Sequence, residues 1–282
     1  MDSQNKPTIL FPYDFSPECD FAIEHLVGLA KLFNFSVEIL NIYDSGTKKF
    51  MQDNKLNKND LVDRIRQMSE DLHEKHGIMS TYLIKNAPIK RIRNISQKEH
   101  VSFTLLGLKK PAKPSTKIMK VVTTSPVPVY VVQEGVPFKP FKHILFPLDD
   151  SIASRQKAKW AVKIANVCKD AIFHIYTISP AALKSKEREF KQYHYIESVE
   201  RFFNQKGVNF DTETSQGSYK DYPHEIKKYA ESINVDLYVI MIRPRKLFSV
   251  IDAIDFQLIF NQRKTPLLCV NQRDVFVGGG FN

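Results

Sequence analysis

Short apolar runs alternate with amphipathic segments along the first half of the chain. The apolar runs predict strands at 8–12, 37–43, 78–84, 103–108 and 127–132. Apolar residues at helical spacing predict helices at 17–33, 57–76, 88–99 and 115–124. Ser16 and Pro17 form a typical helix start, and Gly77 a typical helix end. Strands and helices that alternate in this way indicate βαβ units, with a parallel sheet and helices on both of its faces.

The second half of the chain repeats this order. Its predicted strands are 143–147, 172–177, 208–212, 237–242 and 267–270, and its predicted helices are 152–169, 185–206, 219–232 and 248–261. The segment ILFPYD at 9–14 returns as ILFPLD at 144–149. A repeat of this length indicates a duplicated domain, because the units of a solenoid are much shorter. We therefore predict an α/β protein with domains at 1–136 and 141–273 and a flexible tail at 274–282.

The last predicted strand of each half is apolar, at 127–132 and 266–270. In a sheet that winds outward these strands would lie at an edge, and an uncovered apolar edge favours aggregation. Two arrangements would cover them. Each fifth strand could pack against the fifth strand of the other half, or each could be covered by a helix or loop of its own half.

The composition is typical of a soluble globular protein. Of the 282 residues, 43% are hydrophobic and 26% are charged. No apolar run reaches the roughly 18 residues of a membrane helix, and the polar N-terminal segment differs from a signal peptide. We expect a cytoplasmic protein that does not enter a membrane. Cys19, Cys168 and Cys269 have no metal-binding or redox spacing, so we expect free thiols, two of them in the core.

The formal net charge of +10 is spread over both halves. The densest basic cluster consists of Lys109, Lys110, Lys113, Lys117 and Lys120. Such runs usually form solvated surface, which we favour here over a nucleic-acid-binding face. His73 and His76 are three residues apart near a predicted helix end, but no third metal ligand accompanies them, so we predict no metal site.

Each half opens with an apolar strand that ends in Pro-x-Asp, and Ser-Pro-x-Pro at 125–128 precedes a closing apolar run. Together with the repeat, this pattern resembles the universal stress protein family over about residues 7–133 and 141–271. The resemblance implies two Rossmann-like domains with flavodoxin-type strand order 3-2-1-4-5, packed as a pseudo-dimer through their fifth strands. It also implies an ATP site at the carboxyl ends of the strands.

The family's ATP site combines an Asp after the first strand with a loop that carries Gly-x-x-Gly and a later Gly followed by Ser or Thr. In the first half, Lys110 replaces the second glycine, and the loop is shortened and contains Pro111 and Pro114. The tentative nucleotide or anion pocket that remains consists of Asp14, Gly107, Lys109, Lys110, Ser115 and Thr116. A structural or vestigial role for Asp14 stays open as an alternative, because a carboxylate at this position often caps a turn.

The second half departs further from the family's site. Asp149 is present, but Met241 and Pro244 replace the two glycines, and Asp252 and Asp255 would repel a phosphate. We predict that this half binds no ATP in the family's manner and that Asp149 is vestigial.

The sequence contains no catalytic motif or residue trio, so we predict that the protein is not an enzyme. The leading hypothesis is a cytoplasmic stress-response protein that binds a ligand or an unidentified protein partner, with a degenerate nucleotide site. One alternative is an ATP-binding protein with weak ATPase activity that uses the first-half pocket. Another is a basic module that binds anions or nucleic acid. ATP is the only cofactor that we expect, in the first half alone, and a homodimer of the tandem chain is a further expectation.

Overall fold

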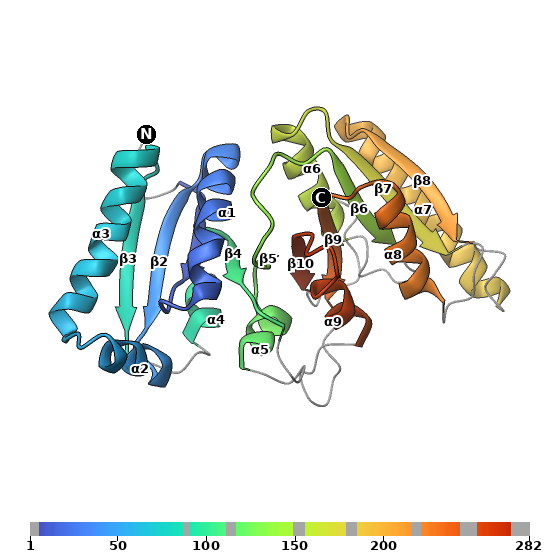
Figure 1. Cartoon of the computed structure of the whole chain (residues 1–282). Coiled ribbons are helices and arrows are strands. Elements are labelled where there is room, and N and C mark those ends of the chain that lie inside the picture. The colour runs from blue at the N-terminus through green and yellow to red at the C-terminus, as the bar shows by residue number, and fades with distance from the viewer. Residues whose placement is uncertain are drawn as a thin grey trace. The chain divides into compact units, whose positions relative to one another are not determined.

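The computed structural model describes residues 6–86, 91–110, 117–148, 156–178, 185–215, 221–242 and 253–271. These residues divide into two compact units, of which the first ends at Phe138 and the second begins at Lys139. Each unit contains its own parallel sheet with helices packed on it (Figure 1). The predicted tail at 274–282 lies outside the described residues.

The first unit is a doubly wound α/β fold. Its strands are β1 (Thr8–Pro12), β2 (Ser36–Ile42), β3 (Ser80–Lys85), β4 (Val101–Gly107) and β5 (Val129–Val132). Its helices are α1 (Pro17–Phe33), α2 (Ser45–Asp53), α3 (Lys58–His76), α4 (Arg91–Ser96) and α5 (Lys117–Thr124). The strands are parallel and lie in the order β3-β2-β1-β4-β5.

The second unit repeats this topology. Its strands are β6 (His143–Leu148), β7 (Ile172–Ile178), β8 (Phe210–Ser215), β9 (Leu237–Ile242) and β10 (Leu267–Asn271). Its helices are α6 (Ala158–Val167), α7 (Lys186–Lys206), α8 (Tyr222–Ser232) and α9 (Ala253–Ile259). The order β8-β7-β6-β9-β10 is that of the first unit, so the predicted tandem Rossmann-like fold with strand order 3-2-1-4-5 is confirmed. The packing of the two fifth strands against each other stays a prediction.

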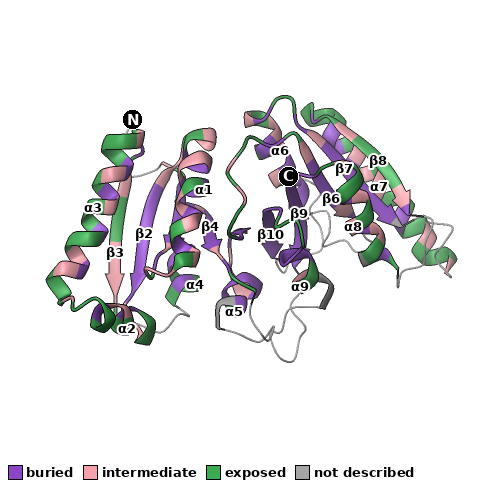
Figure 2. Ribbon diagram, viewed as in Figure 1, coloured by how far each residue is buried: buried purple, intermediate pink, exposed green. Residues whose placement is uncertain are grey.

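The core of each unit lies along its central strands, as the buried ribbons in Figure 2 show. Every residue of β9 is buried, whereas β3 contains no buried residue. This difference follows from topology, because β3 lies at the outer edge of its sheet and β9 lies between β6 and β10. The same effect explains why β8 begins at Phe210, two residues later than predicted. Its exposed polar residues gave no apolar pattern that could mark the strand.

Local signals correctly marked several helix ends. The Ser16 hydroxyl caps α1 by accepting a hydrogen bond from the Cys19 amide, and Gly77 ends α3 with a φ of +68°. The structure adds α2, which the sequence analysis did not predict because its exposed face interrupts any apolar periodicity. Asp44 caps this helix by accepting hydrogen bonds from the Gly46 and Thr47 amides.

All three cysteines are free and buried, in agreement with their expected reduced state. Within the described part of the chain, no helix combines the length and the apolar character that crossing a membrane requires.

Candidate functional site

The carboxyl ends of β1 and β4 meet where the strand order of the first unit reverses. From β1 the chain winds outward through β2 to β3, and it then returns to β4 on the other side of β1. Leu10 pairs with Thr104, so these two neighbouring strands end at the same edge of the sheet. Crevices at such a point are the usual ligand sites of doubly wound folds. Asp14 follows β1 here, and Lys109 and Lys110 follow β4, so the structure brings these three predicted site residues to one edge.

Asp14 is exposed and is engaged locally through one of its two carboxylate oxygens. Its Oδ1 atom accepts hydrogen bonds from the Ser16 amide at 3.0 Å and from the Cys19 thiol at 3.2 Å. Burial, followed by the nearby Asp14 charge, raises the pKa of the Cys19 thiol to about 12, so the thiol remains protonated and can donate. Within the described residues Oδ2 has no hydrogen bond, and it could accept one from a ligand. Asp14 therefore has a structural role, and one of its oxygens remains open to a ligand.

Gly107 ends β4 and packs directly against the first turns of α1. A Cβ atom built on Gly107 would lie 1.6 Å from the backbone oxygen of Glu18 and 3.1 Å from the Cβ of Ala22. No side chain fits in that space. The glycine is thus required for close packing of the helix on the strand, and its presence does not by itself indicate a phosphate site.

The remaining predicted residues of this pocket divide into two groups. Lys109 and Lys110 are exposed directly after β4, and Lys110 occupies the position of the family's second glycine. Ser115 and Thr116 lie outside the described residues. The described part of the pocket therefore offers two ammonium groups and the Asp14 carboxylate, and it lacks the glycine-rich backbone that the family's pattern contains.

The structure adds an aromatic cluster that the sequence analysis missed. Phe15 has a φ of +65°, which is rare for a bulky residue, and its ring stacks on Phe50 of α2 with centroids 4.5 Å apart. Tyr13 meets Phe15 edge to face, and the Arg64 guanidinium lies 5.9 Å from the centre of the Phe50 ring. Strained backbone of this kind is often found at ligand sites. The sequence signal for this cluster was weak. Three aromatic residues stand at 11, 13 and 15, but the fourth, Phe50, reaches this edge only because it belongs to α2.

Asn41 lies beneath this cluster and is fully buried in β2. Its Nδ2 donates a hydrogen bond to the Tyr13 carbonyl at 2.8 Å, whereas its Oδ1 has no partner within the described structure. A buried acceptor without a partner costs about 1–3 kcal/mol, which usually means that a water or a ligand group serves it. An asparagine within the apolar run of β2 was a sequence signal that could have identified this position.

The equivalent edge of the second unit has larger side chains at the corresponding positions. Leu145 pairs with Tyr238 as Leu10 pairs with Thr104, which places the buried Met241 at the position of Gly107. Asp149 and Pro244 lie outside the described residues.

Lys157 precedes α6 in the second unit and corresponds to Ala22 in the repeat. It is only 1% exposed, its ammonium group donates to the Pro147 carbonyl, and its Nζ atom lies 4.4 Å from the centre of the Phe146 ring. Burial lowers the pKa of Lys157 to about 7, against an opposing attraction from Asp255. The second unit therefore has Met241 and Lys157 at the positions that Gly107 and Ala22 occupy in the first unit.

The fold defines a class: doubly wound α/β domains in tandem, which usually bind ligands where the strand order reverses. Residues 140–251 match the model of the Usp family, described as the universal stress protein family. No curated protein matches the chain. The second half of this chain is therefore a domain of the universal stress protein family, and the resemblance inferred from the sequence is confirmed.

Solved structures agree with this assignment at the level of the fold. A universal stress protein from Archaeoglobus fulgidus DSM 4304 is similar over 94% of this chain and 98% of its own, with 16% identity and a TM-score of 0.71. A functionally unknown protein from Pseudomonas aeruginosa PAO1 is similar over 96% of this chain and 94% of its own, with 16% identity and a TM-score of 0.63. Both similarities extend over nearly the whole chain, so they cover the tandem layout as well as the single domain.

Proposed function

We propose that this chain is a non-catalytic stress-response protein that binds a small ligand at the carboxyl edge of the first unit, where triphosphate binding is degraded. The observation that carries this proposal is the contact between Gly107 and the Glu18 carbonyl. This contact gives Gly107, the first glycine of the family's Gly-x-x-Gly pattern, a packing role. Lys110, with a long side chain, stands where the second glycine of that pattern would be.

The start of α1 adds to the argument against phosphates beside Asp14. A helix N-terminus attracts anions through its free amides and its dipole. Here the Ser16 side chain already accepts from the Cys19 amide, and Glu18 and Asp20 place two negative charges in the first turn. Together with Asp14, these carboxylates disfavour a triphosphate at this helix.

The same edge suits a flat ligand that donates hydrogen bonds. Asp14 Oδ2 is an acceptor without a partner in the described structure, and the half-buried Phe15 and Phe50 rings supply an aromatic surface beside it. A nucleoside or another planar heterocycle with N–H groups has the matching chemistry. We therefore infer that the nucleoside end of an ancestral nucleotide site has been kept better than its phosphate end.

A second candidate is the ATP-binding protein with weak ATPase activity. It is favoured by Lys109 and Lys110, which are exposed at the same edge as Asp14 and could bind phosphates by charge. The two candidates differ in what the lysines do: they are essential for ATP binding in the second candidate and dispensable in the first.

Calorimetric titration distinguishes the two candidates. The purified full chain is titrated with Mg-ATP and, separately, with adenosine, after mass spectrometry of denatured material has shown whether a nucleotide copurifies. We expect adenosine to bind at least as tightly as ATP, and we expect the Lys109→Ala/Lys110→Ala variant to leave adenosine binding unchanged. The control variant Lys206→Ala/Lys228→Ala removes the same charge from exposed helix positions in the second unit. ATP binding that is tenfold tighter than adenosine binding, and lost only in the first variant, would establish a phosphate site and overturn the proposal.

Two further assays test the absence of catalysis and the third hypothesis. The parent chain should release phosphate from Mg-ATP no faster than the Lys109→Ala/Lys110→Ala variant does. A gel shift with DNA or RNA should disappear at physiological salt, because contacts made by a diffuse basic surface are screened.

A further inference from the structure

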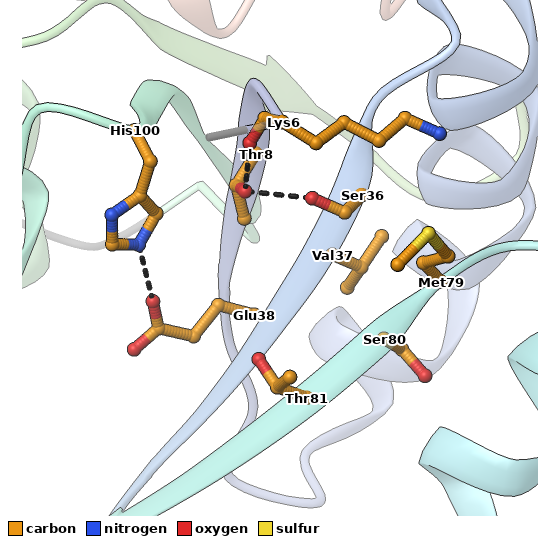
Figure 3. A pocket seen from close by; sticks show the side chains of 9 residues that line it. All are labelled: Lys6, Thr8, Ser36, Val37, Glu38, Met79, Ser80, Thr81 and His100. Carbon is orange, nitrogen blue, oxygen red and sulfur yellow. Dashed lines mark hydrogen bonds and ion pairs between the residues drawn. The ribbon is translucent and has the colours of Figure 1, made fainter. Parts of the chain in front are cut away.

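A polar hollow lies at the opposite, amino-terminal edge of the first unit's sheet, away from Asp14. It has a volume of about 180 Å³, and its walls come from the starts of β1, β2 and β3 and from the residue before β4 (Figure 3). Strand ends at this edge are not where doubly wound folds usually bind ligands. The hollow is therefore distinct from the site described above.

The alternation of side chains along the strands places hydroxyl and carboxylate groups on one face. Thr8 pairs with Ser36, and Glu38 pairs with Thr81. Ser80, the next residue along β3, hydrogen-bonds to Ser69 of α3 and so points to the other face. Since successive side chains of a strand alternate, Glu38 and Thr81 face away from α3.

Glu38 is a buried carboxylate that is paired but still able to accept hydrogen bonds. Its Oε1 atom accepts from the Lys98 ammonium at 2.8 Å, and its Oε2 atom lies 3.1 Å from His100 Nε2. The Glu38 side chain is only 8% exposed. Each carboxylate oxygen has room for two hydrogen bonds, so the group offers further acceptor positions toward the hollow.

The hydroxyl groups of Thr8 and Ser36 also present acceptors. Thr8 donates its proton to the Lys6 carbonyl at 2.9 Å, and the Ser36 hydroxyl lies within reach of the Thr8 hydroxyl at 2.7 Å and the Pro7 carbonyl at 3.3 Å. Their protons are thus used within the protein, while lone pairs remain. The exposed Thr81 hydroxyl has no hydrogen bond within the described structure and can donate or accept.

The side chains that could donate to an anion in the hollow are already engaged within the protein, which disfavours an anion. The Lys6 ammonium donates to Asn34 Oδ1 at 3.0 Å, and Figure 3 shows its side chain extending away from Glu38. His100 faces Glu38 itself. The exposed Met79 adds apolar surface at the rim of the hollow. A neutral ligand with several hydroxyl groups and C–H faces matches this mixture of acceptors, few donors and apolar surface.

From this geometry we propose that the hollow formed by Thr8, Ser36, Glu38 and Thr81 is a binding site for a small neutral polyol of the size of a single sugar ring. Its hydroxyl protons are donated to Glu38 and to the Thr8 and Ser36 oxygens. The Thr81 hydroxyl completes the set of contacts as a donor or an acceptor. The ring's C–H groups lie against Met79.

The test uses D-ribose as the probe, in an NMR titration of the full chain. We expect saturable binding that weakens about threefold to tenfold in Thr81→Val, the loss typical of one hydrogen bond. The control Thr212→Val makes the same change on the exposed edge strand β8 of the second unit and should bind ribose as the parent chain does. Glu38→Gln keeps the shape of the side chain and provides a second variant, with a thermal melt to establish that each variant is folded.

Two results of the ribose titration would overturn the proposal. One is the absence of saturable ribose binding to the folded parent chain, and the other is binding that neither Thr81→Val nor Glu38→Gln weakens. Inorganic phosphate is titrated in parallel, and we expect it to bind more weakly than ribose. Tighter binding of phosphate would make the hollow an anion site and overturn the proposal. A titration with adenosine distinguishes a free sugar from the sugar of a nucleoside. If Thr81→Val leaves adenosine binding unchanged, adenosine binds at the site near Asp14 and not in the hollow. The polyol site can therefore fail while the proposed function stands, and the reverse also holds.

Discussion

The backbone oxygen of Glu18 occupies the space where Gly107 would carry a side chain, at 1.6 Å from the position of a Cβ atom. Helix α1 and strand β4 are far apart in the sequence, yet they are in direct contact at this pair. Because the atom opposite the glycine belongs to the backbone, it cannot rotate away as a side chain could. The contact therefore sets how closely α1 packs beside the candidate site.

Replacing Gly107 with alanine should destabilise the first unit. The added methyl group must displace the backbone of α1, and overpacking of this kind costs about 1–3 kcal/mol or more. Chemical denaturation measures the loss as a lower midpoint. The control Gly46→Ala, in α2, meets only the Asp44 carboxylate at 3.3 Å and should gain about 0.5 kcal/mol from helix propensity. Equal stability of Gly107→Ala and the parent chain would contradict the packing role assigned to this glycine.

Lys157→Met should stabilise the second unit at neutral pH. Burial lowers the pKa of the Lys157 amine to about 7 in the folded chain, whereas the ordinary pKa of an exposed lysine is 10.5. Between these values the unfolded chain binds a proton that the folded chain does not, so the parent chain loses stability as the pH falls from 10.5 to 7. Each pKa unit corresponds to about 1.4 kcal/mol. After the loss of the bond to Pro147, we expect a net gain of about 2 kcal/mol at pH 7.

Denaturation of Lys157→Met at pH 7 and pH 10 measures both the gain and its pH dependence. The advantage over the parent chain should shrink as the pH rises toward 10.5, because the lysine of the unfolded chain then also loses its proton. Lys206→Met changes an exposed lysine and should show neither effect. An advantage that stays constant with pH would mean that packing, rather than the charge, is responsible.

Asp236 should stabilise the start of β6 through its negative charge. Burial raises the pKa of this carboxyl, but Lys139 and the His143 and Lys142 amides more than offset it, so the pKa lies below its usual value. Asp236→Asn should lower the free energy of unfolding at pH 7 by about 2 kcal/mol, because a charged hydrogen-bond network is lost. A group whose folded pKa is depressed contributes above its unfolded pKa, so the difference should vanish as the pH falls through the folded pKa.

Acid and neutral denaturation series test this prediction. Asp63→Asn provides the control, since Asp63 forms an exposed ion pair with Arg66 that should contribute about 0–1 kcal/mol. If Asp236→Asn differs from the parent chain equally at low and neutral pH, the carboxylate charge is not the source of the effect.

His174 should make the second unit sensitive to mild acid. Burial lowers its pKa, the neighbouring His143 lowers it further, and Asp211 opposes the shift. The ring lies 3.1 Å from His143 and 3.3 Å from the Tyr229 hydroxyl, measured between polar atoms. Below the ordinary histidine pKa of 6.5 the unfolded chain gains a proton that the folded chain resists, so stability falls as the pH drops.

His174→Gln should flatten this acid-side loss, which can approach about 1.4 kcal/mol per pH unit for one proton. Urea denaturation between pH 5 and pH 8 provides the measurement. His194→Gln changes a histidine whose side chain is 57% exposed and should keep the slope of the parent chain. An unchanged slope in His174→Gln would assign the acid sensitivity to other groups.

Much of the fold could be predicted because its signals are local. The repeat of residues 9–14 at 144–149 identified the duplication, and the Ser16 and Gly77 caps marked helix ends that the structure contains. Helix α2 and the late start of β8 were missed, because exposed elements at the edge of a domain need little apolar periodicity. The candidate site was predicted only in part. Asp14, Gly107, Lys109 and Lys110 were named, whereas Phe15, Asn41 and Phe50 were not.

The sequence alone determined the alternation of strands and helices, the duplication, and the presence of Lys110 and Met241 where the family's pattern has glycine. These features depend on the order of residue types along the chain. Three further features could be found only from the folded chain: Gly107 faces the Glu18 carbonyl, Phe50 stacks on Phe15, and Lys157 is buried. These contacts join segments that lie far apart in the chain, and they form only where the sheet order and the helix packing bring those segments together.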